Sequence, residues 1–202
     1  MRRLIALALT ACVSLAHAGN QKYEPLAASV QSQMQSTISD QATPFLAFDT
    51  LEEARTWLDA MSKKLERRFP DRHAREEFLV TVHYEAKRAG LDPQMVLGLI
   101  QVESAFRKYA VSSAGARGFM QVMPFWVKQI GQPGHNLFHL RTNLRYGCAI
   151  LKHYLDIERG DYFRALGRYN GSLGKAEYPN TVVRAWISNW KYPLQSAGAL
   201  AR

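Results

Sequence analysis

The sequence predicts a single all-α domain. Apolar residues recur at helical spacing through most of the chain after residue 50, and no segment shows the alternation of apolar and polar residues that is typical of half-buried strands. With 202 residues, the chain is long enough for one domain with a substantial core and too short for two comfortable ones. The sequence contains no internal repeat. We therefore expect one helical domain, preceded by N-terminal segments of different character.

Residues 1–18 have the composition of a secretory signal peptide: two arginines, an apolar run from Leu4 to Leu15, and Ala-His-Ala ending at Ala18. The apolar run is shorter than the roughly 20 residues that a membrane-spanning helix requires. A lipoprotein signal, with an acyl chain on Cys12, is an alternative, but the apolar run continues past Cys12 toward a good cleavage site. We therefore expect cleavage after Ala18 and export to the periplasm, rather than an outer-membrane lipoprotein.

The chain is basic, with a formal charge of +9 that falls to +7 once the two arginines of the signal peptide are removed. A basic surface favours an anionic partner, such as a cell-wall polymer, phospholipid headgroups or nucleic acid. Export argues against nucleic acid, and the sequence has no recognition-helix or aromatic-basic RNA-binding pattern. Without Cys12, Cys148 is the only thiol left, so we expect no internal disulfide.

Two segments precede the main domain. Residues 19–49 are rich in Gln, Ser, Ala and Thr without a sustained period, and we interpret them as a flexible leader. Residues 50–70 are predicted to form an additional N-terminal helix, because Thr50 and Glu53 have the spacing of a capping box. Apolar residues then recur at helical spacing from Leu51 until Pro70 ends the run.

The main domain is predicted to span residues 71–195. Its first helix runs over about 71–89, and the second begins at Asp92-Pro93, an N-cap followed by a first-turn proline. In this second helix Val96, Leu99, Ile100 and Glu103 share one face, so Glu103 lies on the apolar stripe. Further helices are expected over about 119–130, 142–157 and 161–169, and from near residue 179.

Glu103 is the candidate catalytic carboxylate. Burial and the partial negative charge of a helix C-terminus both raise the pKa of a carboxyl group, as a general acid near neutral pH requires. The alternative is a partly buried glutamate that pairs with a nearby basic residue. No Asp or Glu occurs between Ser104 and Leu155, which favours chemistry by one carboxylate in which the substrate supplies the nucleophile.

Folding could still bring a distant second carboxylate into the site. Glu85, Asp156 and Glu177 are the candidates, and we interpret all three as solvated or ion-paired surface acids. His135 and His139 have a spacing compatible with zinc, but Pro133-Gly134 makes a helix there doubtful, so a loop or surface role is favoured. Cys148 is interpreted as a small buried residue. We expect most of the four tryptophans to lie in the core.

Four short motifs follow one another in the order and spacing of the soluble lytic transglycosylase catalytic domain. The sequence resembles that family over about residues 71–190, with Asn143 and Gly147 also matching its Asn-x-x-x-Gly helix. The motifs are Glu103-Ser104, Gly118-Phe119-Met120-Gln121, Tyr169-Asn170 and Tyr178-Pro179-Asn180-Thr181-Val182. The resemblance implies a lysozyme-like fold and an enzyme that cleaves peptidoglycan glycan strands.

The resemblance also implies roles for individual residues. Glu103 would protonate the glycosidic oxygen between N-acetylmuramic acid and N-acetylglucosamine, and then accept a proton from the muramic 6-hydroxyl, which attacks C1 to give a 1,6-anhydromuramyl end. The implied substrate-binding residues are Ser104, Met120, Gln121, Tyr169, Asn170 and Tyr178. The family implies no metal and no organic cofactor, and we expect a monomer.

The chain departs from the family pattern at two places. Phe119 stands where leucine is usual, and Arg168 and Gly171-Ser172 flank the Tyr-Asn pair where Ala and Ala-Gly are common. We expect these changes to alter the shape and substrate preference of the cleft more than its chemistry. Two alternatives stay open: a hydrolytic muramidase of similar fold, and a non-catalytic wall-binding protein recruited by cell-envelope assembly machinery through its polar leader.

Overall fold

The computed structural model describes residues 21–192, and this part of the chain is all-α, as the sequence predicts. Pairing of the β type is confined, within these residues, to isolated bridges from Arg117 to Val111 and to Val122. The helices are α1 Ala28–Ile38, α2 Leu51–Leu65, α3 Arg72–Arg88, α4 Pro93–Ser104, α5 Phe125–Ile130, α6 Leu140–Ile157, α7 Tyr162–Tyr169, α8 Glu177–Ala185 and the π-helical η1 Trp186–Trp190.

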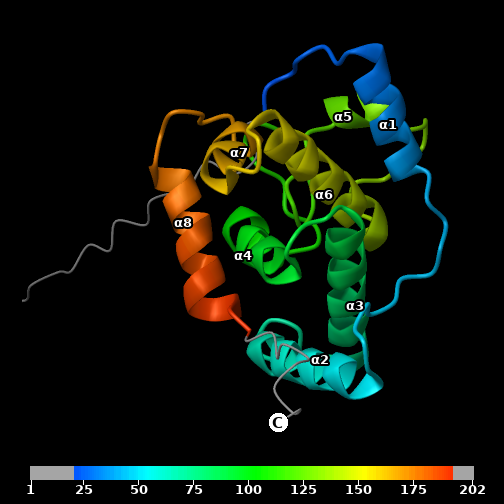
Figure 1. Ribbon diagram of the computed structural model, residues 1–202, viewed down its shortest axis with the longest axis vertical. Helices are drawn as coiled ribbons and strands as arrows, with labels where there is room; N and C mark the ends of the chain where they lie inside the picture. Colours follow the sequence, from blue (N-terminus) through cyan, green and yellow to red (C-terminus); the bar gives the residue numbers. More distant parts are fainter. Residues whose placement is uncertain (1–20, 193–202) are drawn as a thin grey trace, which may run out of the picture.

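Helix α4 lies in the middle of the molecule, with α3, α6, α7 and α8 around it (Figure 1). Its N-terminus is fixed as predicted, because the Asp92 carboxylate accepts hydrogen bonds from the backbone N–H groups of Gln94 and Met95. Gly98 allows close packing against the last helix, since a Cβ atom there would lie 2.9 Å from the backbone of Trp186. Helix α4 therefore presents its C-terminal end to the interior of the fold.

One predicted helix boundary is wrong. Helix α5 begins at Phe125 rather than near residue 119, because Gly118 and Gln121 have positive φ angles of 76° and 48° that interrupt helical geometry. Residues 117–122 instead form a tight turn, closed by hydrogen bonds between the backbones of Arg117 and Val122. Helix α8 begins at Glu177, near residue 179 as predicted, and has Pro179 in its first turn.

The predicted N-terminal helix is confirmed as α2. Both halves of the capping box form: the Thr50 side chain accepts from the Glu53 N–H, and the Glu53 carboxylate accepts from the Thr50 N–H. Trp57, Met61 and Leu65 on one face are buried, and α2 packs against α3. This helix lies at one end of the molecule, next to the C-terminal end of the described chain (Figure 1).

The flexible leader expected over residues 19–49 differs from the structure in residues 21–49. Helix α1 lies in this segment and packs against α5 and α6 (Figure 1). Met34 and Ile38, spaced one helical turn apart, are buried, and the Gln31 side chain donates to the Gln129 carbonyl at 2.7 Å. The segment has too few apolar residues to give a sustained helical period. The sequence alone therefore does not show where these residues pack.

The predicted signal peptide, its cleavage site and Cys12 lie outside the described residues, as do residues 193–195 at the predicted end of the domain. Within residues 21–192, none of the helices combines the length and apolar character needed to cross a membrane.

Candidate active site

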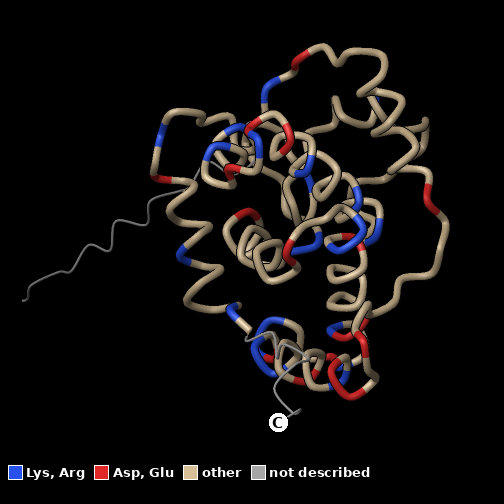
Figure 2. Tube along the Cα trace, viewed as in Figure 1, with Lys and Arg blue, Asp and Glu red and all other residues tan. Residues whose placement is uncertain are grey.

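Glu103 lies in the last turn of α4 and is the one charged residue of that helix (Figure 2). The helix ends directly afterwards, because Ala105 and Phe106 adopt left-handed φ angles of 50° and 64°. The Glu103 side chain is buried, at 4% exposure, and its Oε1 accepts a hydrogen bond from the Tyr178 hydroxyl. The structure thus brings together two residues that the sequence motifs place 75 positions apart.

Tyr178 is held over Glu103 by the first turns of α8. Burial, followed by the nearby negative charge of Glu103, raises the pKa of the Tyr178 phenol well above its ordinary value. The phenol therefore stays protonated at any physiological pH and remains a hydrogen-bond donor. A neutral donor of this kind can orient a carboxyl group without fixing its charge.

Tyr169, the last residue of α7, is linked to the turn that contains Met120. Its hydroxyl donates to the Met120 carbonyl at 2.8 Å, and the side chain is fully buried. Burial is the main cause that raises the pKa of Tyr169 well above its usual range, and the charge of Glu103 adds to it. Tyr169 thus connects the environment of Glu103 with the turn that contains Met120.

The turn around Met120 and Gln121 is held by its own side chains. The Gln121 amide donates to the carbonyls of Gly118, at 2.9 Å, and Ala110, at 3.1 Å. Met120 packs against Gly147 of α6, where an added Cβ atom would lie 2.3 Å from the Met120 sulfur. Both predicted substrate-binding side chains are buried in the structure, so they fix the shape of the turn.

Asn143 is a positioning residue that sequence reasoning did not single out. From α6, its Oδ1 accepts from the Met120 N–H, and its Nδ2 donates to the carbonyls of Arg117 and Leu137, all at 2.8 Å. It also approaches Gly118 so closely that an added Cβ there would lie 2.4 Å from Nδ2. The match of Asn143 to the family's Asn-x-x-x-Gly helix is the feature of the sequence that could have indicated this role.

Ser104 and Asn170, two further predicted site residues, make local hydrogen bonds. The Ser104 hydroxyl donates to the Ile100 carbonyl at 3.2 Å and is buried inside α4. Asn170 follows α7 directly, and its Nδ2 donates to the Ser172 hydroxyl at 3.2 Å. Their predicted contacts with sugar stay predictions.

Asp156 and Glu177 lie on the surface, as interpreted from the sequence, but the surface position expected for Glu85 is wrong. Glu85 of α3 is buried, where it is ion-paired with Arg88, Arg141 and Arg145, at 3.2, 3.3 and 3.2 Å. Asp156 is exposed and pairs with Lys152 on the same helix. Glu177 is also exposed, at the start of α8.

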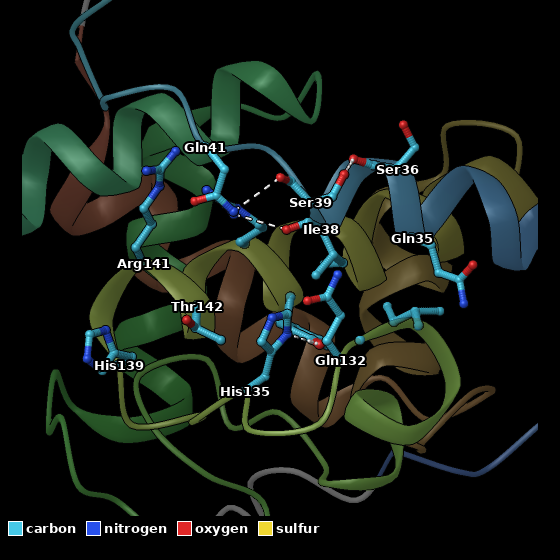
Figure 3. Close-up of a pocket in the computed structure, with 14 residues that line it drawn as sticks. Gln35, Ser36, Ile38, Ser39, Gln41, Gln132, His135, His139, Arg141 and Thr142 are labelled. Carbon is cyan, nitrogen blue, oxygen red and sulfur yellow. Dashed lines mark hydrogen bonds between the residues drawn. The ribbon is translucent and has the colours of Figure 1, made fainter.

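The two histidines considered as metal ligands line a cavity of about 710 Å³, which is bordered by residues of α1, of α6 and of the loop before α6 (Figure 3). The Nδ1 atom of His135 lies 2.7 Å from the Tyr146 hydroxyl, and His139 precedes α6 on the surface. In the part of the chain that the structure describes, no three His, Cys, Asp or Glu side chains gather as metal ligands would.

Cys148 and most of the tryptophans belong to the core, as expected. Burial raises the pKa of the Cys148 thiol well above its ordinary value, which makes it a poor nucleophile. Trp57, Trp126 and Trp190 are buried, and Trp186 is partly exposed. Cys148 is therefore not a candidate for the reactive group of the site.

A family model described as the transglycosylase SLT domain matches residues 81–184 of this chain. The chain belongs to the SLT domain family. The matched region contains Glu103, Tyr178 and the other residues on which the resemblance was based, whereas α1, α2 and η1 lie outside it. The resemblance seen in the sequence motifs is thereby confirmed.

Two curated relatives each match part of this chain. It is 34% identical over 111 residues to the transglycosylase of Enterobacteria phage PRD1, across 52% of this chain and 41% of that protein. It is 34% identical over 138 residues to membrane-bound lytic murein transglycosylase C of Mannheimia succiniciproducens, across 58% of this chain and 36% of that protein. The chain thus spans less than half the length of these relatives.

Among solved structures, an inactive mutant of the lytic transglycosylase Slt from Pseudomonas aeruginosa is 26% identical to this chain. The match has a TM-score of 0.45 and covers 60% of this chain and 22% of that one.

Proposed function

We propose that this SLT protein is a peptidoglycan lytic transglycosylase, which cleaves the β-1,4 bond between N-acetylmuramic acid and N-acetylglucosamine and leaves a 1,6-anhydromuramyl end. The observation that carries the proposal is the buried Glu103 at the end of α4, which accepts a hydrogen bond from the neutral Tyr178 phenol. Family membership supplies the class of substrate.

In the proposed reaction Glu103 acts first as an acid and then as a base. The protonated carboxyl donates its proton to the glycosidic oxygen while the bond from that oxygen to C1 breaks. The muramic O6 then forms a bond to C1, and its proton returns to the Glu103 carboxylate. No water is consumed, and Glu103 ends the cycle protonated, as it began. Tyr178 orients the carboxyl throughout, because its phenol keeps its own proton.

The remaining predicted site residues would build the cleft around this group. Tyr169 and Gln121 hold the turn that contains Met120, and we propose that this turn, together with Ser104 and Asn170, shapes the sugar-binding surface. We further infer that the protein works as a monomer on glycan strands in the periplasm after removal of a signal peptide. Cell-envelope assembly machinery is the proposed source of its partners.

The test is digestion of purified peptidoglycan by the mature protein, followed by mass spectrometry of the released muropeptides. Anhydromuramyl products, lighter than the hydrolytic ones by one water, are expected. Reducing ends would instead identify the muramidase alternative, in which a second carboxylate activates water. Absence of lysis by a protein that sediments with insoluble wall would favour the non-catalytic wall-binding alternative.

Glu103→Gln tests the assignment of the acid. Loss of the only proposed proton donor should lower the rate of lysis by about 10²–10⁴-fold, the range typical of general acid–base catalysis. Sedimentation with insoluble wall should persist, since the amide keeps the shape of the side chain. Glu177→Gln, which alters an exposed glutamate beside Tyr178, is the matched control and should retain full activity. Full lysis by Glu103→Gln would mean that another group is the acid.

A further inference from the structure

Gln21, at the start of the described chain, lies inside the domain rather than on its surface. Its side chain is 4% exposed, although the neighbouring residues 22–25 are exposed. It contacts residues that follow it by 100 positions or more, all of them in or beside the turn that contains Met120 and Gln121. This position lies outside the segment that the SLT family model matches, so it is a feature of this chain rather than of the matched domain.

The amide group of Gln21 satisfies several polar groups at once. Its Nε2 donates to the Gln121 carbonyl at 3.3 Å, and its Oε1 accepts from the Met123 N–H at 3.1 Å and from the Trp126 indole N–H at 3.2 Å. The Tyr169 hydroxyl donates to the Met120 carbonyl in the same turn. Only a side chain with both donors and an acceptor can serve all these groups.

These contacts act on a turn whose backbone is unfavourable by itself. Gln121 adopts a φ angle of 48°, in the left-handed region that side-chain-bearing residues rarely occupy. The Gln121 side chain donates to the carbonyls of Gly118 and Ala110 on one side of the turn. On the other side, the Gln21 side chain donates to the backbone carbonyl of Gln121. Removing Gln21 would leave a buried carbonyl and a buried indole N–H without this partner, so the turn would shift to find others.

We propose that Gln21 is a positioning residue for the active site: it fixes the turn of residues 118–123, and through Tyr169 the surroundings of Glu103, without touching the substrate. The inference rests on the proposed function. With this role for Gln21, the N-terminal segment contributes to catalysis in addition to packing against α5 and α6. A purely structural anchor would stabilise the fold and leave the turnover rate unchanged, so the two roles are separable by experiment.

The chain offers a matched control in Gln31. This residue also belongs to the N-terminal segment, and its side chain also donates to a backbone carbonyl of the domain, that of Gln129 at 2.7 Å. Gln129 lies in α5, outside the turn of residues 118–123. Gln21→Ala and Gln31→Ala therefore remove similar anchors from one segment, and only the first disturbs the turn.

The experiment compares the two variants in the full mature chain, with melting temperature, kcat and KM on soluble glycan strands measured well below both melting temperatures. Gln21→Ala should lower kcat by about 10- to 100-fold, as small displacements of an active site do, with KM changed much less. Gln31→Ala should keep the wild-type kcat even if its melting temperature falls as far. Equal kcat values in the two variants would overturn the proposal.

A second measurement keeps the proposal testable apart from enzymatic activity. In NMR spectra of the wild type and both variants, the Trp126 indole N–H and the amide resonances of residues 118–123 should shift in Gln21→Ala and stay in place in Gln31→Ala. Unchanged resonances in Gln21→Ala would overturn the positioning role, whereas an inactive wild type with shifted resonances would overturn the proposed function alone.

Gln21→Met serves if the alanine variant fails to fold. Methionine keeps most of the side-chain volume, but it cannot donate to the Gln121 carbonyl and is only a weak acceptor for Met123 and Trp126, so kcat should fall while the melting temperature stays closer to wild type than in Gln21→Ala. Wild-type kcat in Gln21→Met would contradict the proposal.

Discussion

Two buried glutamates on neighbouring helices have opposite surroundings. Glu85 of α3 and Glu103 of α4 are 1% and 4% exposed. Glu85 accepts hydrogen bonds from the guanidinium groups of Arg88, Arg141 and Arg145, whereas Glu103 accepts a hydrogen bond from the phenol of Tyr178. Two buried carboxylates can therefore have donors of different charge, and we expect this difference to decide what each of them can do.

Guanidinium groups stay positively charged, so they stabilise the charged form of the carboxylate that they surround. The cluster around Glu85 also includes Asp40, which lies 3.2 Å from Arg141 and 3.7 Å from Arg88, and so ties the N-terminal segment to α3 and α6. A phenol whose pKa is raised by burial donates a hydrogen bond to Glu103 without adding a positive charge. The first arrangement suits structure, and the proposed acid–base role rests on the second.

The largest effect that separates the two glutamates is on stability. Glu85→Ala leaves the buried guanidinium group of Arg145, and the partly exposed ones of Arg88 and Arg141, without their main counter-charge and should lower the free energy of unfolding by about 3–5 kcal/mol. Glu103→Gln should change it by less than about 1 kcal/mol, because a neutral side chain of the same shape replaces it. Urea denaturation measures both, and Asp156→Ala, which breaks an exposed pair with Lys152, is the control expected to cost under about 1 kcal/mol. Equal losses for Glu85→Ala and Glu103→Gln would break the comparison.

A third buried titratable group, His83 of α3, extends the comparison to a side chain that must stay neutral. Burial, with a smaller contribution from Lys87, lowers the pKa of His83 from 6.5 to about 4. Above pH 6.5 the imidazole is neutral in the folded and the unfolded chain. As the pH falls from 6.5 toward 4, only the unfolded chain gains the proton, so this group lowers the stability by up to about 3 kcal/mol.

His83→Phe should therefore remove part of the acid sensitivity. Between pH 7 and pH 5 the wild type should lose about 2 kcal/mol of unfolding free energy through His83, and the variant should lose correspondingly less. Denaturation curves at the two pH values give the difference. An unchanged pH dependence in the variant would show that His83 binds its proton equally well in the folded protein.

The smallest effect concerns the donor to Glu103. Tyr178→Phe removes one hydrogen bond from the carboxyl and should lower kcat by about tenfold, which corresponds to about 1.4 kcal/mol, with little change in KM. Since the pKa of Tyr178 lies well above 10, its ionisation does not shape activity below pH 10. The variant should therefore be slower than the wild type throughout the neutral range, where the wild-type phenol is protonated; a wild-type kcat in Tyr178→Phe would mean that the phenol does not orient the acid.

Local signals in the sequence were sufficient for most helices and for the acid. The capping box at Thr50, the Asp92-Pro93 start of α4 and the periodic spacing that places Glu103 on an apolar face each depend on residues a few positions apart. Such features act within one or two helical turns, so they can be read without knowing the fold. The motifs also supplied Tyr178 as the partner of Glu103.

The boundary of α5 and the structure of residues 21–49 could not be obtained in this way. The turn before α5 depends on the positive φ angle of Gln121, a residue with no local preference for it. Helix α1 depends on the surfaces of α5 and α6, which are more than 85 residues away in the sequence.

The sequence by itself determined that the chain is helical, that Glu103 lies on a buried helix face, and that its motifs are those of the SLT family. The tertiary structure decided which buried polar groups meet: the three arginines around Glu85, the Asn143 contacts with the turn, and the insertion of Gln21 beside Gln121 and Trp126. The physical reason is that hydrogen bonds and ion pairs act over a few ångströms in space, between residues separated by up to 105 positions in the chain.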